Sequence, residues 1–344
     1  MIESILLGTY TKQTSKGVYQ IDLNTESKQL TNLQLVAEVE NPTYLALSKK
    51  NILYAVDRFD NQGGLSVTDL NSPQNVLQHI VAPGTPPAYV TVDEKHQFVF
   101  DANYHEGTLH AYSINNDHTL TLDSTFTNTG KGPLKEQDGS HLHYVDRTPD
   151  GNLIACDLGT DQVFVLDYDS TGFKIISTFE TTPGFGPRHI VFNNTGDTAY
   201  LVGELSSSVA VLSYKDCQLT HLQTIKTIPD DWNQHNGCAA IRITDDSRFL
   251  YVSNRGYDSI AVFEIQADGQ LKLIQNISVE GSFPRDFALS HEQNFLVVGN
   301  QTTNNLSLFE RNSNDGKLEL IQKDVAAPEV VCVHFNKKNG ENYV

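Results

Sequence analysis

Apolar and polar residues alternate along most of the chain in short runs of about 4 to 8 residues, rich in Val, Ile, Tyr and Phe. Clusters of Asn, Asp and Gly separate these runs, as is typical of turns between strands. No stretch keeps apolar residues at helical spacing over about three turns, so any helix can only be short and peripheral. The pattern therefore predicts an all-β protein.

The alternating pattern repeats along the chain. The segment NPTYLALSKKNILYAVDR aligns with PPAYVTVDEKHQFVFDANY, HLHYVDRTPDGNLIACDLG, PRHIVFNNTGDTAYLVGEL, CAAIRITDDSRFLYVSNRG and PRDFALSHEQNFLVVGNQT. Each unit predicts four successive strands joined by polar turns. The units open at Pro42, Pro87, His141, Pro187, Cys238 and Pro284. A period of about 45 to 50 residues is typical of propeller blades built from four antiparallel strands.

Six complete units leave a fragment at each end of the chain. The segment PEVVCVHFNKK matches only a first strand, whereas the segment from residue 3 to about residue 40 matches the second, third and fourth strands. Together the two fragments predict a seventh blade that closes the ring and pairs edges that would otherwise be exposed. We therefore expect residues 1–344 to form one seven-bladed β-propeller domain.

Charge and composition narrow the function classes. The chain has 344 residues, is 39% hydrophobic and carries a formal net charge of −18. This charge opposes attraction to nucleic acid or to an anionic membrane, so we expect neither as a partner. A small anionic substrate stays possible, because a few arginines can set the local potential of a cleft. The sequence indicates no particular oligomeric state.

The chain begins without a basic leader and cleavage site, and it contains no run of about 18 apolar residues, which predicts a cytoplasmic protein. Four cysteines lie far apart and form no C-x-x-C pair. Most of them sit in apolar strand-like runs, so we interpret them as reduced core residues. They are Cys156, Cys217, Cys238 and Cys332.

Aligning the units defines two rings of equivalent positions. The loop after the second strand carries Tyr10, Arg58, Tyr104, Leu158, Glu204, Arg255 and Gln301. The start of the innermost strand carries Tyr44, Tyr89, His143, His189, Ala240, Asp286 and Val330, with Arg188 and Arg285 one position earlier in their blades. Strands repeated around an axis present their loops around a central opening. We therefore expect one end of the channel to gather His141, His143, Arg188, His189, Glu204, Arg255 and Arg285.

The chain resembles a known family over nearly its whole length. The segments that carry the resemblance are GSHLHYVDRTPDGNLIACDLGTDQV, GFGPRHIVFNNTGDTAYLVGELSSSVAV, RFLYVSNRGYDSIAVF and PRDFALSHEQNFLVVGNQT. In their order and spacing they are similar to the lactonase-type propellers, which include 6-phosphogluconolactonases of one bacterial type and fungal carboxy-muconate lactonizing enzymes. The resemblance places the family's active-site residues on His141, His143, Arg188, Glu204 and Arg255. One departure is Ala240, where the family usually has a glutamate.

Opening a lactone needs a base that activates water and donors aimed at the developing oxyanion. Glu204 or one histidine of the pair His141 and His143 could be the base, and Arg188 and Arg255 supply donors. The structural alternative for Glu204 is an ion pair between blades, and for His189 a packed position at a strand start. We assign catalytic roles to His143, Arg188, Glu204 and Arg255, and substrate-binding roles to His141, His189, Arg285 and Arg58.

The H-x-H pair also suits a metal, but no third ligand stands at a suitable spacing, so we expect no metal site. The chain has no G-x-S-x-G elbow, Walker loop or dinucleotide fingerprint, so we expect neither a serine hydrolase nor a nucleotide cofactor.

Three functions are open. The first is hydrolysis of a sugar lactone, which by resemblance is 6-phosphogluconolactone of the pentose phosphate pathway. The second is a lactonizing cycloisomerase of the muconate type, and the third is a binding scaffold without catalysis. Converging His, Arg and Glu residues favour an enzyme, and the breadth of the family favours the hydrolase.

Overall fold

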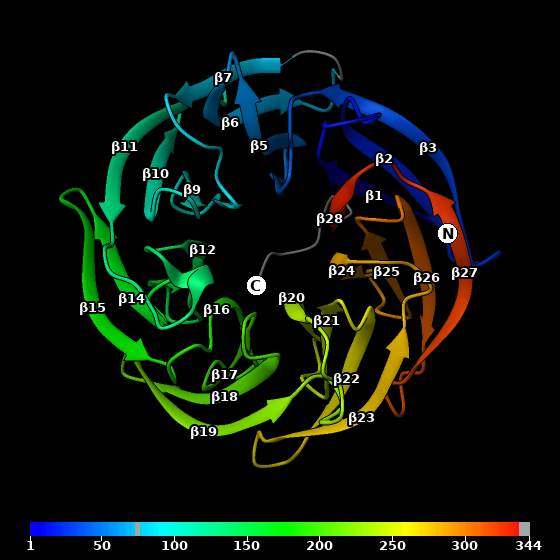
Figure 1. Cartoon of the computed structure of the whole chain (residues 1–344). Helices are drawn as coiled ribbons and strands as arrows, with labels where there is room; N and C mark the ends of the chain where they lie inside the picture. Colours follow the sequence, from blue (N-terminus) through cyan, green and yellow to red (C-terminus); the bar gives the residue numbers. More distant parts are fainter. Residues whose placement is uncertain (73–75, 337–344) are drawn as a thin grey trace.

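The computed structural model describes residues 1–72 and 76–336. Seven sheets of four antiparallel strands stand around a central channel, with one strand of each sheet nearest the axis (Figure 1). The predicted fold, an all-β propeller of seven four-stranded blades, is confirmed. The one helical element in the described residues is the short 3-10 helix η1 (Lys135–Gln137).

Six blades are each built from one continuous stretch of chain that runs from the innermost strand outward. The first consists of β4 (Leu45–Leu47), β5 (Ile52–Phe59), β6 (Gln62–Asp69) and β7 (Val76–Ala82), and the second of β8 (Tyr89–Asp93), β9 (Phe98–Asn103), β10 (Thr108–Ile114) and β11 (Leu120–Thr127). The third consists of β12 (Leu142–Arg147), β13 (Leu153–Asp157), β14 (Gln162–Asp169) and β15 (Gly172–Glu180), and the fourth of β16 (Pro187–Phe192), β17 (Thr198–Gly203), β18 (Ser208–Lys215) and β19 (Gln218–Lys226). The fifth consists of β20 (Gly237–Ile243), β21 (Phe249–Arg255), β22 (Ser259–Ile265) and β23 (Leu271–Ser278), and the sixth of β24 (Pro284–Leu289), β25 (Phe295–Asn300), β26 (Asn305–Arg311) and β27 (Leu318–Ala326).

Both ends of the chain build the seventh blade, called here the closing blade. Its order is β28 (Val330–Phe335), β1 (Ile2–Thr9), β2 (Gly17–Asn24) and β3 (Gln29–Glu38). The innermost strand β28 pairs with β1 in antiparallel register, with Leu7 opposite Val333 and Gly8 opposite Cys332. The predicted closure of the ring by its two ends is confirmed.

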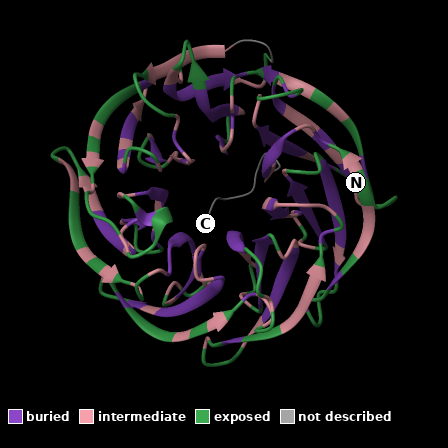
Figure 2. Cartoon of the chain, viewed as in Figure 1, coloured by how far each residue is buried: buried purple, intermediate pink, exposed green. Residues whose placement is uncertain are grey.

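The burial of each strand follows from its distance to the axis (Figure 2). Middle strands are covered on both faces by neighbouring blades, so they read as continuous apolar runs; all five residues of β13 (LIACD) are buried. Outermost strands such as β15 mix exposed and half-buried positions, because one face meets solvent. This difference explains why apolar runs and alternating runs succeed one another within each repeat.

Neighbouring blades share their cores. One hydrophobic cluster joins Ile5 and Leu7 of the closing blade with Val297 and Leu308 of the sixth blade. Another joins residues of the second, third and fourth blades, including Phe100, Phe164 and Leu212. Because no blade has a core of its own, we propose that the whole chain forms one domain.

Buried Asp and Asn side chains at the ends of the second strands hold the loops that surround the channel. Asp157 is fully buried and accepts hydrogen bonds from the main-chain N–H groups of His141, Gly159 and Thr160 at 2.8, 3.0 and 3.1 Å. Asn254, just before Arg255, accepts a hydrogen bond from the Thr227 hydroxyl at 2.7 Å. These bonds fix the residues that follow each second strand.

Cys156, Cys238 and Cys332 are buried, as predicted, whereas Cys217 is half-buried in the turn between β18 and β19. Across the two described stretches of chain, none of the helical structure is long and apolar enough to cross a membrane.

Candidate active site

A cavity of about 410 Å³ opens at the end of the channel where the innermost strands begin. Five of the predicted site residues line it: His143, Glu204, Arg255, Arg285 and Arg58. Its other lining residues are Tyr10, Lys12, Asn41, Thr43, Thr85, Pro86, Pro87, Ala88, Tyr104 and His105. The loops of most blades therefore meet around one cavity, as the aligned repeats predict.

β-Bulges aim three of the charged or polar side chains at the channel. In β12, Leu142 pairs with Asp157 and Tyr144 with Cys156, so His143 is an extra residue without a partner in the ladder. Arg188 in β16 and Arg285 in β24 are skipped in the same way. A bulge turns the side chain of the extra residue away from the sheet face that its neighbours share.

The bulges correct the alignment made from the sequence. That alignment placed His143 level with His189, but the strand pairing makes Tyr144 the equivalent of His189. In the closing blade the skipped residue is Val331, because Thr9 pairs with Val330 and Gly8 with Cys332. Cys332, rather than Val330, is therefore the equivalent residue there.

Glu204 joins two buried arginines. Its Oε1 lies 2.8 Å from Arg255 Nη2, and its Oε2 lies 2.9 Å from Arg188 Nε, which is an ion-pair distance without hydrogen-bond alignment. Arg188 also donates to the Ala239 carbonyl at 2.7 Å, and Arg255 donates to the Gly237 carbonyl at 3.1 Å. Both guanidinium groups are thus fixed in place. Arg255 lines the cavity, whereas Arg188 does not line it and pairs with the lining residue Glu204.

Opposing effects set the charge state of this cluster. Burial alone would raise the pKa of Glu204, but the positive charges of Arg255 and Arg188 outweigh it and hold that pKa below its usual range. Burial lowers the pKa of Arg188 to about 9, with Arg255 and Arg285 adding to the effect and Glu204 opposing it. At neutral pH the cluster therefore consists of one carboxylate and two guanidinium cations.

His143 is an uncharged imidazole at the same cavity. Burial, followed by the positive charge of Arg188 and then Arg285, lowers the pKa of His143 well below its usual value. Its Nδ1 is buried and makes no hydrogen bond with the residues that the structure describes, and its ring stands edge-on to Tyr104 with 5.8 Å between centroids. A neutral imidazole carries one nitrogen with a free lone pair, so it can accept a proton.

The structure does not bring His141 to the cavity. Its ring stacks on Tyr104 with 4.3 Å between centroids, while its Nδ1 lies 2.8 Å from the Tyr104 carbonyl oxygen and its Nε2 2.9 Å from Asp138 Oδ1. The strand begins after His141 and bulges at His143, so the two histidines do not share a strand face as the H-x-H spacing suggests. His141 instead supports Tyr104.

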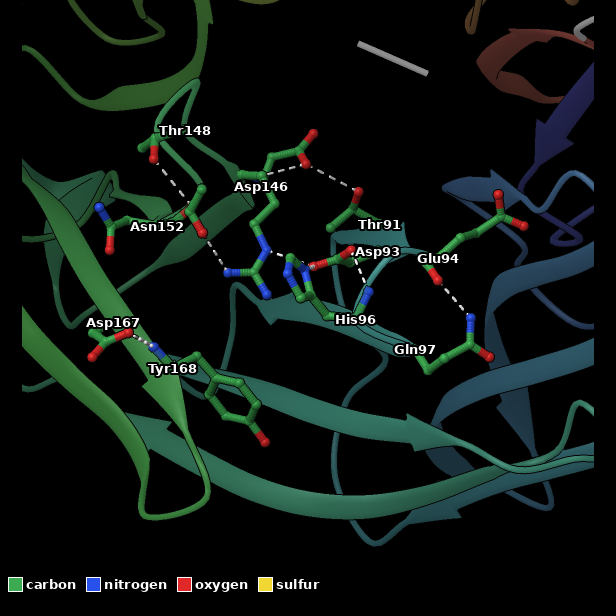
Figure 3. A network of polar contacts seen from close by, with 12 residues as sticks. Thr91, Asp93, Glu94, His96, Gln97, Asp146, Thr148, Asn152, Asp167 and Tyr168 are labelled. Atoms are coloured by element: carbon green, nitrogen blue, oxygen red, sulfur yellow. Dashed lines mark hydrogen bonds and ion pairs between the residues drawn. The ribbon is translucent and has the colours of Figure 1, made fainter. Parts of the chain in front are cut away.

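His189 faces a second cavity, at the other end of the innermost strands. This cavity has a volume of about 550 Å³, and its wall includes Tyr44, Tyr89, Tyr144, His189 and Arg242. Figure 3 shows polar contacts beside it, where Thr91 donates to Asp146 and His96 lies 2.7 Å from Asp93. The ring centroids of His143 and His189 are 5.2 Å apart with 63° between the ring planes, so the two rings pack against each other between the two cavities.

Two further cationic residues, Arg58 and Lys12, line the first cavity. Arg58 is exposed at the rim and forms a long ion pair of 3.8 Å with Glu40. Lys12, which the sequence analysis missed, lies in the loop after β1, two positions beyond the aligned residue Tyr10. The only feature of the sequence that points to Lys12 is its position two residues after Tyr10.

Across residues 1–72 and 76–336, no group of three or more His, Cys, Asp or Glu side chains is arranged to hold a metal ion. That activity needs neither a metal nor another cofactor stays a prediction.

Several known proteins are similar to this chain over nearly its whole length. A 6-phosphogluconolactonase of Bacillus subtilis is 40% identical over 338 residues, which cover 96% of this chain and 97% of that protein. The crystal structure of a protein from Lactobacillus plantarum is 52% identical with a TM-score of 0.96, covering 98% of this chain and 100% of that one. The periplasmic gluconolactonase of Pseudomonas aeruginosa is 28% identical with a TM-score of 0.91, covering 97% and 99%. Residues 4–335 match the family described as a lactonase with a seven-bladed β-propeller, and this span includes every cavity residue, so the chain belongs to that family.

Proposed function

We propose that this protein hydrolyses a sugar lactone to the open hydroxy acid, and that its substrate is 6-phosphogluconolactone. One observation carries the proposal: an uncharged His143, Glu204 and Arg255 line a single cavity, and Glu204 also pairs with the buried Arg188. The names of the relatives in Bacillus subtilis and Pseudomonas aeruginosa, a 6-phosphogluconolactonase and a gluconolactonase, support this substrate class. In this role the protein acts in the cytoplasm, in the pentose phosphate pathway.

The cavity can supply each step of the hydrolysis. A water molecule attacks the lactone carbonyl carbon while His143 takes a proton from it. The carbonyl oxygen becomes an oxyanion, which Arg255 stabilises with a charged donor and Arg188 through its positive charge. The bond between the carbonyl carbon and the ring oxygen then breaks, and the ring oxygen leaves with a proton returned by His143. Lactone and water are thereby converted to one hydroxy acid.

The base could be Glu204 or a histidine on the sequence alone, and the contacts favour His143. Both oxygens of the Glu204 carboxylate are occupied by ion pairs with Arg255 and Arg188, whereas His143 Nδ1 has no hydrogen-bond partner among the described residues. His143 faces the cavity, whereas His141 lies outside it. We therefore assign Glu204 the role of a positioning residue that orients Arg188 and Arg255, and His143 that of the base.

A panel of lactones tests this function. We expect the purified protein to accelerate the loss of 6-phosphogluconolactone above the spontaneous rate, and to do so equally after treatment with a strong chelator, because the arginines stabilise the charge. The panel includes glucono-δ-lactone and a carboxy-muconate. Turnover of the muconate alone would indicate a cycloisomerase, and no turnover of any compound would indicate a binding scaffold.

A further inference from the structure

The first cavity has two chemically different halves. The third, fourth and fifth blades contribute His143, Glu204 and Arg255. The sixth, closing and first blades, which are consecutive in the ring, contribute the cations Arg285, Lys12 and Arg58. The closing blade lies across the channel from the fourth (Figure 1). Among the described residues that line the cavity, Glu204 is the only carboxylate, so all charged residues that line the half opposite Glu204 are cations.

Two of these cations lie over one aromatic ring and have no anionic partner within residues 1–72 and 76–336. Lys12 Nζ lies 4.0 Å and Arg285 Cζ lies 5.6 Å from the centre of the Tyr10 ring. Neither charged group makes a hydrogen bond or ion pair with any residue in the described part of the chain. Arg188 and Arg255, in contrast, are bound to Glu204 and to main-chain carbonyls. Lys12 and Arg285 are therefore the cations with donors left for a ligand.

Glu329 holds the loop that carries Lys12. Its Oε1 accepts the N–H of Lys12 at 2.9 Å, and its Oε2 accepts those of Gln13, Thr14 and Ser15 at 3.0, 3.0 and 3.1 Å. Burial alone would raise the pKa of Glu329, but these backbone hydrogen bonds outweigh it and lower that pKa, so the carboxylate is ionised. Because Glu329 accepts hydrogen bonds from main-chain N–H groups, it does not pair with the Lys12 ammonium, which has no anionic partner among the described residues.

We propose that Lys12 and Arg285, placed on Tyr10, form a subsite for a phosphate monoester, and that Glu329 is the positioning residue of this subsite. Arginine offers a planar fork that matches phosphate oxygens, and lysine adds a point charge. In a 6-phosphorylated sugar δ-lactone the carbonyl and the phosphate-bearing CH₂ group lie on either side of the ring oxygen and point away from each other, so the substrate can contact both halves of the cavity. This inference rests on the proposed lactone hydrolysis and adds how the phosphate is recognised.

Kinetics on a matched pair of substrates test the subsite. For Lys12→Met and Arg285→Met we expect KM for 6-phosphogluconolactone to rise about tenfold or more, with a much smaller change in KM for glucono-δ-lactone, because only the former offers a charged acceptor. Lys16→Met is the control, since Lys16 lies in the same loop but outside the cavity. Equal losses on both lactones, or an unchanged KM for the phosphorylated one, would overturn the subsite.

Glu329→Gln separates positioning from mere structural support. The amide brings an N–H₂ donor against the backbone donors of residues 12–15, so we expect KM for the phosphorylated lactone to rise several-fold while kcat holds. A parallel fall of kcat on both lactones would instead show general damage to the fold.

Binding measurements keep the subsite testable if no lactone is turned over. By calorimetry, we expect inorganic phosphate to bind the wild-type protein and the Lys16→Met variant, and to bind Lys12→Met about tenfold more weakly. If the lactone is turned over but Lys12→Met binds phosphate as tightly as the wild type, the subsite is rejected and the proposed function stands. Phosphate binding that depends on Lys12, without turnover, rejects the proposed function and keeps the subsite.

Discussion

A chain that ends at Glu329 is expected to unfold or aggregate at temperatures where the full chain is stable. The truncation removes β28 and with it Val330, Val331, Cys332, Val333 and Phe335, all of which are buried. Burying one such side chain contributes about 1.5–3 kcal/mol. Losing five therefore costs about as much as the whole free energy of unfolding of a typical domain, about 5–15 kcal/mol. Thermal unfolding monitored by circular dichroism measures the effect.

A circular permutant provides the matched control. Asn336 donates its N–H to the Ser4 carbonyl at 2.9 Å, so the end of β28 lies beside the start of β1. Joining the two ends of the full chain and opening it between Glu329 and Val330 keeps every blade complete. We expect the permutant to melt within a few degrees of the original chain. If the truncated chain melts there too, ring closure by β28 does not stabilise the propeller.

The second large effect is on catalysis. Arg188→Met and Arg255→Met are each expected to lower kcat for the lactone about 10²- to 10³-fold, because each variant removes a positive charge that stabilises the developing oxyanion. Each also leaves main-chain carbonyls and one Glu204 oxygen unpaired, so the free energy of unfolding should fall by about 1–3 kcal/mol. Kinetics on the folded fraction separate the two effects.

Arg242→Met is the control for these variants. Arg242 is half-buried and, like Arg188 and Arg255, paired with a carboxylate, with 2.8 Å between its Nη2 and Asp286 Oδ1, but it lines the second cavity. We expect a similar loss of stability and a kcat within about threefold of the wild type. Equal losses of kcat in all three arginine variants would mean that stability, not oxyanion binding, controls the rate.

The repeat explains why the fold could be predicted from the sequence. The sequence of each blade has the same pattern of strands and turns, so the six aligned copies support one another. The two unmatched chain ends can then only complete a seventh blade. The register of single residues could not be predicted as well. A bulge inserts one residue at His143, Arg188 and Arg285, and the apolar pattern around it is the same with or without the bulge.

From the sequence, the candidate site could be predicted only at positions that are equivalent among the aligned blades. Glu204 and Arg255 follow the second strand in their blades, and they border the cavity as expected. His189 faces the other cavity, because consecutive residues beside a bulge point to different ends of the channel. Lys12 escaped prediction because its place depends on Glu329, more than 300 residues away in the sequence.

The kinetics of His143→Asn test the central claim most directly. With glucono-δ-lactone, which has no phosphate group that titrates in this range, and with substrate loss corrected for the spontaneous rate, we expect kcat/KM of the wild type to stay flat from about pH 8 to 6. Burial and the arginines lower the pKa of His143 well below its usual value, so it is already deprotonated throughout that range. His143→Asn should reduce kcat about 10²- to 10⁴-fold, since the amide cannot accept the proton of the attacking water. A variant with near-normal kcat would contradict His143 as the base, and wild-type activity that falls with a midpoint near pH 6.5 would contradict the lowered pKa.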